Sequence, residues 1–255
     1  MGIKMTRIIM HGCCGRMGRM IADLAAHDKA CEIVAGIDAR GGEGMAFPVY
    51  TALDDCQEEA DVMIDFSTAA AVDEMLDWCA GKKLPCVVCT TGLTPAQEEH
   101  LQKSARQAAV LKSANMSLGI NLLFKVLQEA AAKLSAAGFD MEIVEKHHNQ
   151  KLDAPSGTAL ALADVISEAA GGGFDYVYDR STRREKRPAK EIGISAVRGG
   201  TIVGDHDVIF AGEDEVVTFS HRAYSRAVFG KGALEAAKFL AGKEPGLYTM
   251  ADVIG

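Results

Sequence analysis

The sequence predicts an α/β fold, in which a doubly wound parallel sheet is followed by a second α+β domain with a mixed sheet. Short apolar runs alternate with helical stretches over residues 7–108, which is typical of a parallel sheet covered by helices on both faces. Past residue 118 the pattern changes to one long amphipathic helix and then to runs of strands. A chain of 255 residues has room for one large domain or two modest ones.

In the first part, several apolar runs have the length of buried strands. The expected strands are 7–11, 32–37, 61–66 and 86–89. The expected helices are 17–27, 72–80 and 95–108. Thr94 and Pro95 are typical of a helix start, as an N-cap and a first-turn proline.

In the second part, residues 120–136 have apolar side chains at helical spacing, and 139–147 alternate like a half-buried strand. The remaining expected elements are a helix at 154–170, a solvated polar loop at 180–190, strands at 192–197, 207–210 and 215–220, and a final helix at 226–241.

Charge and composition exclude several classes of protein. The formal net charge of −8 argues against a protein that coats nucleic acid or an anionic membrane. No stretch approaches the ~20 apolar residues of a membrane helix, and no signal-peptide pattern is present. Seven cysteines, with Cys13 and Cys14 adjacent, make a poor disulfide framework. We therefore expect a cytoplasmic protein. The Cys86–Cys89 pair has no second pair to complete a zinc site, so no metal is expected.

A glycine-rich turn follows the first expected strand. Its sequence, Gly12-Cys13-Cys14-Gly15-Arg16-Met17-Gly18, has GxxGxxG spacing rather than the commoner GxGxxG. Glycines at a strand-to-helix turn let the backbone approach a pyrophosphate, which the helix N-terminus attracts. Asp38 ends the next strand, where a carboxylate can accept hydrogen bonds from an adenosine ribose. Strand, glycines, helix, strand and acid in this order predict dinucleotide binding, whereas glycines present only for packing are the alternative.

A second constellation follows the expected strand at 139–147. His147, His148 and Lys151 can hold or transfer protons near neutral pH. Ser156 and Thr158 open the next helix, whose N–H groups and hydroxyls suit a carboxylate ligand. The alternatives are a solvated strand end for the histidines and simple N-capping for Ser156 and Thr158.

These residues carry a resemblance to a known family. The stretch Glu-x-His-His-x-x-Lys-x-Asp-Ala-Pro-Ser-Gly-Thr-Ala at 145–159 resembles the signature of the dihydrodipicolinate reductases, also called 4-hydroxy-tetrahydrodipicolinate reductases. Further matching motifs occur in the family's order: Gly15-Arg-Met-Gly18, Asp65-Phe-Ser67, Thr90-Thr-Gly92, Ala114 to Asn121, Val197-Arg-x-Gly200, Gly204-x-His206, Ser225-Arg226 and Gly246 to Val253. The resemblance covers essentially the whole chain.

The resemblance implies an oxidoreductase of diaminopimelate and lysine biosynthesis that reduces a small cyclic dicarboxylate with NADH or NADPH. It implies a Rossmann-type dinucleotide domain at 1–118, completed by 226–255, and a substrate-binding and oligomerisation domain at 119–225. It also implies a homotetramer, with no nucleic-acid or membrane partner.

The resemblance further implies roles for individual residues. His147 falls at the acid/base position and Lys151 at the proton donor. The implied substrate contacts are His148, Ser156, Gly157 and Thr158. The implied cofactor contacts are Gly12, Cys13, Cys14, Gly15, Arg16, Met17, Asp38, Cys89, Thr90, Thr91, Ser113, Ala114, Asn115 and Met116.

The chain departs from the family pattern at three places. Cys89 replaces a glycine, so we expect an altered backbone approach to the nicotinamide there, and Ala69 stands where a proline is common. Ala39 follows Asp38 where many members have an arginine for the 2′-phosphate of NADPH, so we expect NADH to serve at least as well as NADPH. Two other functions remain open from the residues: an aspartate or homoserine dehydrogenase, and a dinucleotide-sensing regulator.

Overall fold

The computed structural model describes residues 5–113 and 115–255. The chain forms two compact units. One takes its described residues from 5–118, without 114, and from 227–255, and the other comprises Gly119–Arg226. The chain thus enters the second unit once and returns to complete the first.

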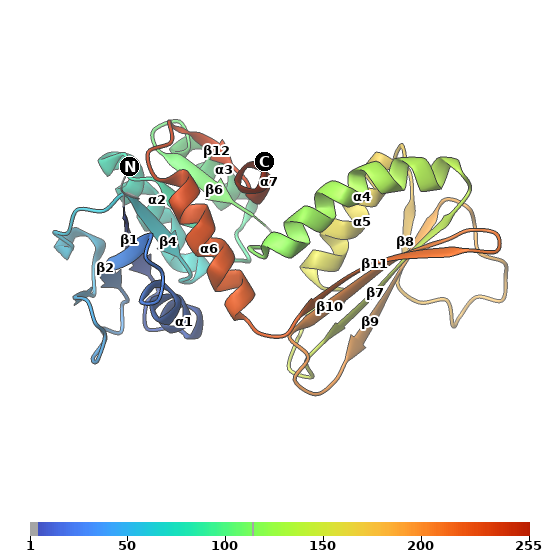
Figure 1. The fold of residues 1–255 in the computed structure, drawn as a ribbon, viewed down its shortest axis with the longest axis horizontal. Helices are drawn as coiled ribbons and strands as arrows, with labels where there is room; N and C mark the ends of the chain where they lie inside the picture. Colours follow the sequence, from blue (N-terminus) through green and yellow to red (C-terminus); the bar gives the residue numbers. More distant parts are fainter. Residues whose placement is uncertain (1–4, 114) are drawn as a thin grey trace. The chain divides into compact units, whose positions relative to one another are not determined.

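The first unit is built on a seven-stranded sheet whose pairings are all parallel (Figure 1). In spatial order its strands are β12 (Gly246–Tyr248), β6 (Ala109–Lys112), β5 (Cys86–Val88), β4 (Val62–Asp65), β1 (Thr6–His11), β2 (Cys31–Ile37) and β3 (Val49–Tyr50). The strand order reverses direction beside β1, as in doubly wound sheets, and the expected fold class is confirmed.

Helices cover both faces of this sheet because its strands are apolar on both sides. Ile8 and Met10 of β1 join one buried cluster, and Ile9 between them joins another. The first cluster lies under α1 (Arg16–Ala25), α6 (Ala227–Leu240) and α7 (Met250–Ile254). The second lies under α2 (Ala69–Lys82) and α3 (Pro95–Ser104), and a short 3₁₀ turn, η1 (Leu53–Asp55), adds Leu53 to it.

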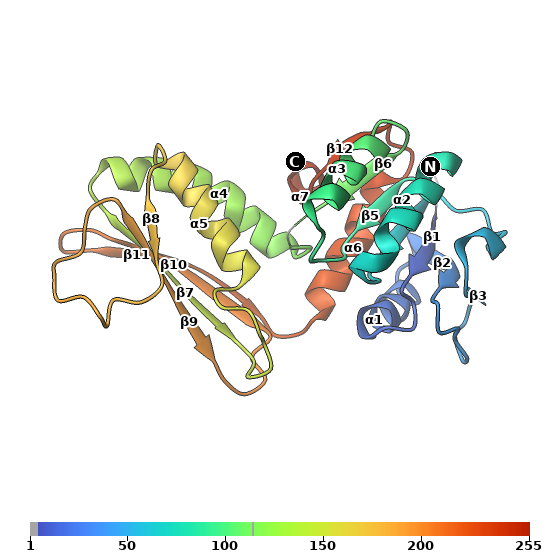
Figure 2. The same cartoon turned by 180° about the vertical axis from the view of Figure 1, so that it is seen from behind.

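The second unit is a mixed five-stranded sheet with helices on one face (Figure 2). Its strands, in spatial order, are β11 (Val216–Ala223), β10 (Gly204–Ala211), β7 (Asp140–His147), β9 (Glu191–Arg198) and β8 (Asp175–Val177). Alternate residues such as Met141 and Ile143 pack against α4 (Leu118–Ala136) and α5 (Gly157–Ala169). On β11, Val216 is exposed.

None of the helices in the described residues has the length and apolar character needed to cross a bilayer.

The observed elements include four short strands that were not expected, β3, β6, β8 and β12, and they differ from the expectations at two helices and one loop. The helix expected at 95–108 ends at Ser104, and β6 follows as a strand of four buried or half-buried residues. The loop at 180–190 is irregular as expected, but Arg180 and Arg187 are tied to Glu142 of β7 rather than solvated. The helix expected at 154–170 starts at Gly157, because Ser156 caps it.

Candidate active site

The glycine turn joins β1 to α1, and its glycines are required by close contacts. Gly12 has φ +79°, and a Cβ there would lie 2.5 Å from the carbonyl oxygen of Phe66. A Cβ on Gly18 would lie 2.3 Å from the carbonyl oxygen of Gly12. Gly15 is the N-cap of α1 and has no side chain to satisfy the free N–H groups of the first turn. The turn therefore presents bare backbone and a positive helix end, and both suit a pyrophosphate.

Asp38 follows β2 and lies beside this turn. Its Oδ2 accepts the backbone N–H of Cys14 at 3.1 Å, and its Oδ1 accepts the backbone N–H and the Nε of Arg40 at 3.1 and 3.3 Å. Burial alone would raise the pKa of Asp38, but the hydrogen bonds from Arg40 and Cys14 bring that pKa below its ordinary value. Asp38 is thus an ionised acceptor at neutral pH. It borders a pocket of about 450 Å³ that the glycine turn and the Phe66–Thr68 loop also line.

The other expected cofactor residues follow β5 and β6, whose carboxyl ends lie at the same sheet edge as those of β1 and β2. Lys112 Nζ donates to the carbonyl of Thr90 at 2.5 Å, which fixes the loop that contains Thr91. Ser113 Oγ donates to the carbonyl of Asn115 at 2.9 Å. Cys89 is buried in the hydrophobic cluster below α6, so its thiol fills the core.

Met116 and Ala114 complete the set of expected cofactor residues. Met116 is buried, and a Cβ on Gly232 of α6 would lie 1.7 Å from its carbonyl oxygen, so this glycine allows the Met116 segment to lie against α6. Ala114 lies outside the described residues.

A buried acid at the end of β4 was not among the expected site residues. Asp65 Oδ1 lies 2.9 Å from Nδ1 of His11 and accepts the Ser67 hydroxyl at 2.5 Å. Burial would raise the pKa of Asp65, but the contacts with His11 and Ser67 lower it overall. His11 and Ser67 line the same pocket as Asp38. The signal was present in the sequence, since an acid at the end of a buried strand needs a partner.

In the second unit, Glu145 is the centre of a buried polar cluster. Its Oε1 accepts the Ser156 backbone N–H at 2.9 Å and Arg198 Nη2 at 2.7 Å. Its Oε2 lies 2.6 Å from His147 Nδ1 and accepts Arg198 Nη1 at 2.7 Å. Glu145 is fully buried, and burial would raise its pKa, but Arg198, His147 and the Ser156 N–H lower it. The carboxylate is therefore ionised and draws strand β7, strand β9 and the start of α5 together.

His147 is held as a neutral imidazole. Burial lowers its pKa, and this effect exceeds the opposing contact with Glu145. The ionised carboxylate at Nδ1 favours the tautomer with the proton on that nitrogen, which leaves the lone pair on Nε2. A Cβ on Gly204 would lie 3.0 Å from Nε2, so the glycine keeps that side of the ring open.

The segment after β7 carries the two other titratable residues of the constellation. Lys151 Nζ lies 2.8 Å from Asp153 Oδ1, and the backbone N–H of Lys151 donates to the carbonyl of His148. Gly199 N–H donates to the His147 carbonyl and Asn149 N–H to the Gly200 carbonyl. These bonds fix the segment against the β9–β10 loop, so Lys151 is a positioned cation.

The start of α5 serves as both a cap and a candidate anion site. Ser156 Oγ accepts the Ala159 N–H at 3.2 Å and lies 3.1 Å from His206 Nε2. Burial lowers the pKa of His206 to about 4, so this ring is neutral and shares a hydrogen bond with the Ser156 hydroxyl. The N-capping alternative thus describes Ser156, whereas the exposed Gly157 and half-buried Thr158 open the helix toward solvent.

Comparisons with known proteins agree over the whole chain. The family description "Dihydrodipicolinate reductase, N-terminus" matches residues 6–116, and "Dihydrodipicolinate reductase, C-terminus" matches residues 119–254. A 4-hydroxy-tetrahydrodipicolinate reductase of Caldanaerobacter subterraneus subsp. tengcongensis is 52% identical over 250 residues, 98% of each chain. One of Clostridium tetani is 45% identical over 246 residues, 96% of each chain. The dipicolinate-bound dihydrodipicolinate reductase of Paenisporosarcina sp. TG-14 is similar in structure, with a TM-score of 0.81 and 25% identity over 98% of this chain and 100% of that one.

Proposed function

This chain belongs to the dihydrodipicolinate reductase family, and we propose how its own residues carry out the family's reaction. That reaction is the reduction of 4-hydroxy-tetrahydrodipicolinate to tetrahydrodipicolinate with NADH or NADPH, in diaminopimelate and lysine biosynthesis. The observation that supports it best is the Glu145 cluster, which presents a neutral His147 and, close by in sequence, the ammonium of Lys151 and an open helix start. An aspartate or homoserine dehydrogenase and a dinucleotide-sensing regulator find no support among these relatives.

The first unit fits a dinucleotide. The bare glycine turn has no room for side chains at Gly12 and Gly18, and Asp38 is ionised at the edge of the adjoining pocket. The turn from Gly12 to Met17 borders the pyrophosphate, which the N–H groups at the start of α1 bind, and Asp38 accepts the ribose hydroxyls. The loops with Cys89, Thr90 and Thr91 and with Ser113, Ala114, Asn115 and Met116 border the rest of the cofactor. The bound dinucleotide supplies a hydride.

The second unit binds the substrate and supplies the proton. His148, Gly157, Thr158 and the Ser156 cap receive a carboxylate of the substrate at the start of α5. Electron density builds on the substrate ring as the hydride arrives, and a positioned cation relieves it. His147 is neutral, so Lys151 is the group that carries a proton to donate, while His147 Nε2 accepts a hydrogen bond or a proton in turn.

The assembly we propose is a homotetramer held by the second unit. Helices cover one face of its sheet. Val216 of β11 and Val197 of β9 are exposed apolar residues outside the packed cluster.

We also assign the chain to the cytoplasm, since all seven cysteines are free.

The activity is tested in an assay coupled to the synthase that makes the substrate. Purified protein should oxidise NADH only when pyruvate, aspartate semialdehyde and a condensing synthase are all present. A flat nicotinamide absorbance in the complete mixture, with an active synthase shown separately, would reject the function.

A further inference from the structure

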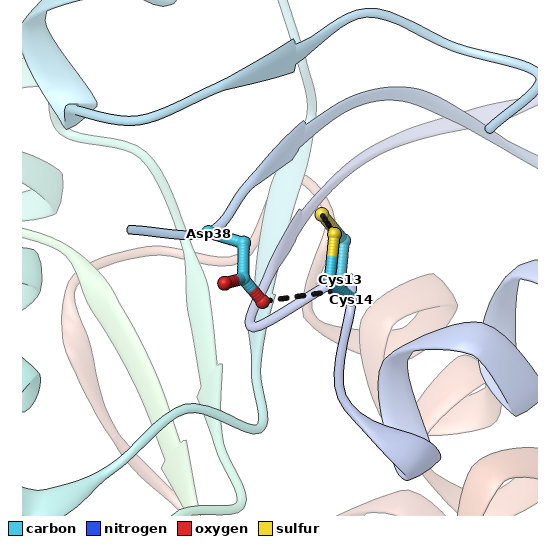
Figure 3. A group of neighbouring side chains, drawn as sticks. All are labelled: Cys13, Cys14 and Asp38. Carbon is cyan, nitrogen blue, oxygen red and sulfur yellow. Dashed lines mark hydrogen bonds between the residues drawn. The ribbon is translucent and has the colours of Figure 1, made fainter. Parts of the chain in front are cut away.

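Two thiols of the glycine turn and the carboxylate of Asp38 beside it lie close together, although no metal was expected there from the sequence. Cys13 Sγ lies 3.7 Å from Cys14 Sγ, and one oxygen of Asp38 lies within 4.8 Å of both sulfurs (Figure 3). Figure 3 shows the sulfurs side by side, with the Asp38 carboxylate bonded to the backbone of the same turn. The set is the only group of three or more His, Cys, Asp or Glu side chains in the described residues that is close enough to share a metal ion.

The separation of the sulfurs suits a tetrahedral ion. Two thiolates bound to zinc at ~2.3 Å in a tetrahedral arrangement lie about 3.8 Å apart, close to the 3.7 Å between the two sulfurs here. Carboxylate oxygen is a regular third ligand of such ions. The thiols therefore need little rearrangement to bind one ion together.

The surroundings hold the three groups in place and add a fourth donor. Cys13 Sγ packs against Gly36 of β2, where a Cβ would lie 2.6 Å from the sulfur. Cys14 Sγ packs in the same way against Gly42, at 2.5 Å from a Cβ there. Cys14 Sγ also donates to the carbonyl of Gly41 at 3.2 Å. An ion that replaced the thiol proton would leave this carbonyl oxygen available as a ligand.

We propose that Cys13, Cys14 and Asp38 form a binding site for a thiophilic divalent cation such as Zn²⁺, and that the bound ion excludes the dinucleotide. The ion displaces both thiol protons to solvent. It also takes the Asp38 carboxylate, which the cofactor ribose requires. The exclusion, but not the ion binding, rests on the proposed use of this turn for the cofactor.

The binding is tested with Co²⁺ as a spectroscopic probe of reduced, chelator-treated protein. We expect an intense near-ultraviolet sulfur-to-cobalt band that saturates at one Co²⁺ per chain and is lost when one equivalent of Zn²⁺ is added. Cys14→Ser should abolish the band. Cys56→Ser is the matched control, because Cys56 is a buried thiol 3.5 Å from a different carboxylate, Glu58, and it should keep the band.

The absence of the band in the parent protein, or its persistence in Cys14→Ser, would overturn the site. Should Cys14→Ser fail to fold, Asp38→Asn takes its place. The loss of a direct ligand should weaken Co²⁺ binding by more than the roughly 10–100-fold known for outer-shell partners. These measurements use neither substrate nor turnover, so they stand even where the reductase assay fails.

The exclusion is tested by NADH titration. At a Zn²⁺ concentration ten times its Kd, competition should raise the apparent Kd of NADH about 11-fold in the parent protein. In Cys14→Ser, the ratio of NADH affinities with and without Zn²⁺ should stay near one. An unchanged NADH affinity in the Zn²⁺-saturated parent would overturn the exclusion.

Discussion

Oε2 of the fully buried Glu145 lies 2.6 Å from Nδ1 of His147. The two residues are two positions apart on β7, so both side chains lie on the same face of the sheet. Arg198 holds the carboxylate from β9 through two hydrogen bonds of 2.7 Å. Glu145 is therefore a positioning residue, which fixes both the orientation and the tautomer of His147.

We expect Glu145→Gln to lower kcat and to shift the acid limb of the kcat profile to lower pH. The contact with Glu145 opposes the effect of burial on the pKa of His147, so its loss lowers that pKa further. Glu142→Gln is the control. Glu142 is also a residue of β7 that pairs with arginines, namely Arg180 and Arg187, but it lies away from His147. An acid limb that moves equally in both variants would contradict the positioning role.

We expect substitutions of the proposed proton-transfer residues to impair catalysis and to leave cofactor binding unchanged. His147→Gln and Lys151→Ala should each lower kcat by roughly 10²–10⁴-fold, the usual range for a lost acid or base. NADH affinity, measured by fluorescence titration, should stay unchanged, because both residues belong to the unit at 119–226. Loss of NADH binding in both variants would contradict this division.

The helix start should govern substrate affinity. Thr158→Val removes a hydroxyl at the first turn of α5 and should raise KM for the substrate more than it lowers kcat. Steady-state kinetics with the coupled synthase give both constants. A fall in kcat at unchanged KM would place Thr158 in the chemical step instead.

The fold and the site were predictable where the pattern was long or the spacing specific. Both sheets follow from periodicity, since the runs are buried on two faces or alternate clearly, and the glycine turn follows from the spacing of its glycines. β3, β8 and β12 span two or three residues, too few to show a period, and only pairing with neighbouring strands forms them. Arg198 and His206 could not be assigned to the Glu145 cluster from the sequence. They are 53 and 61 residues from Glu145 along the chain, and only the pairing of β7 with β9 and β10 brings them together.

The stability of the first unit should depend on pH through His100. Its ring nitrogens lie 2.7 Å from Asp73 and 2.8 Å from Asp77 of α2, and Gln97 also donates to Asp73. The hydrogen bond with Asp73 raises the pKa of His100. A raised pKa in the folded state stabilises the protein below the unfolded value of about 6.5, and this stabilisation is lost as pH rises through the folded pKa.

His100→Gln should therefore lower Tm more at about pH 5.5 than at about pH 8.5. His27→Gln is the matched control, since Nδ1 of His27 contacts the Asp23 backbone carbonyl instead of a carboxylate. A Tm difference between His100→Gln and the parent that is equal at the two pH values would contradict the prediction.

We expect the choice between NADH and NADPH to depend on Asp38 and Arg40. In the proposed cofactor site, an ionised Asp38 accepts ribose hydroxyls and repels a 2′-phosphate, and Ala39 supplies no cation to offset that repulsion. Arg40 does reach the site, since its Nε lies 3.3 Å from Asp38 Oδ1, but its side chain is 76% exposed. In this contact the Arg40 guanidinium is already paired with Asp38, and solvent screens its attraction to a 2′-phosphate.

We therefore expect NADH to serve at least as well as NADPH and Ala39→Arg to move the preference toward NADPH. The ratio of kcat/KM for NADH and NADPH measures this preference. The ionic strength is kept fixed because salt screens the phosphate contact. A preference for NADPH of about tenfold or more, ~1.4 kcal/mol, would contradict this expectation. If Arg40→Ala abolished that preference, Arg40 would be the residue that turns from Asp38 to the phosphate.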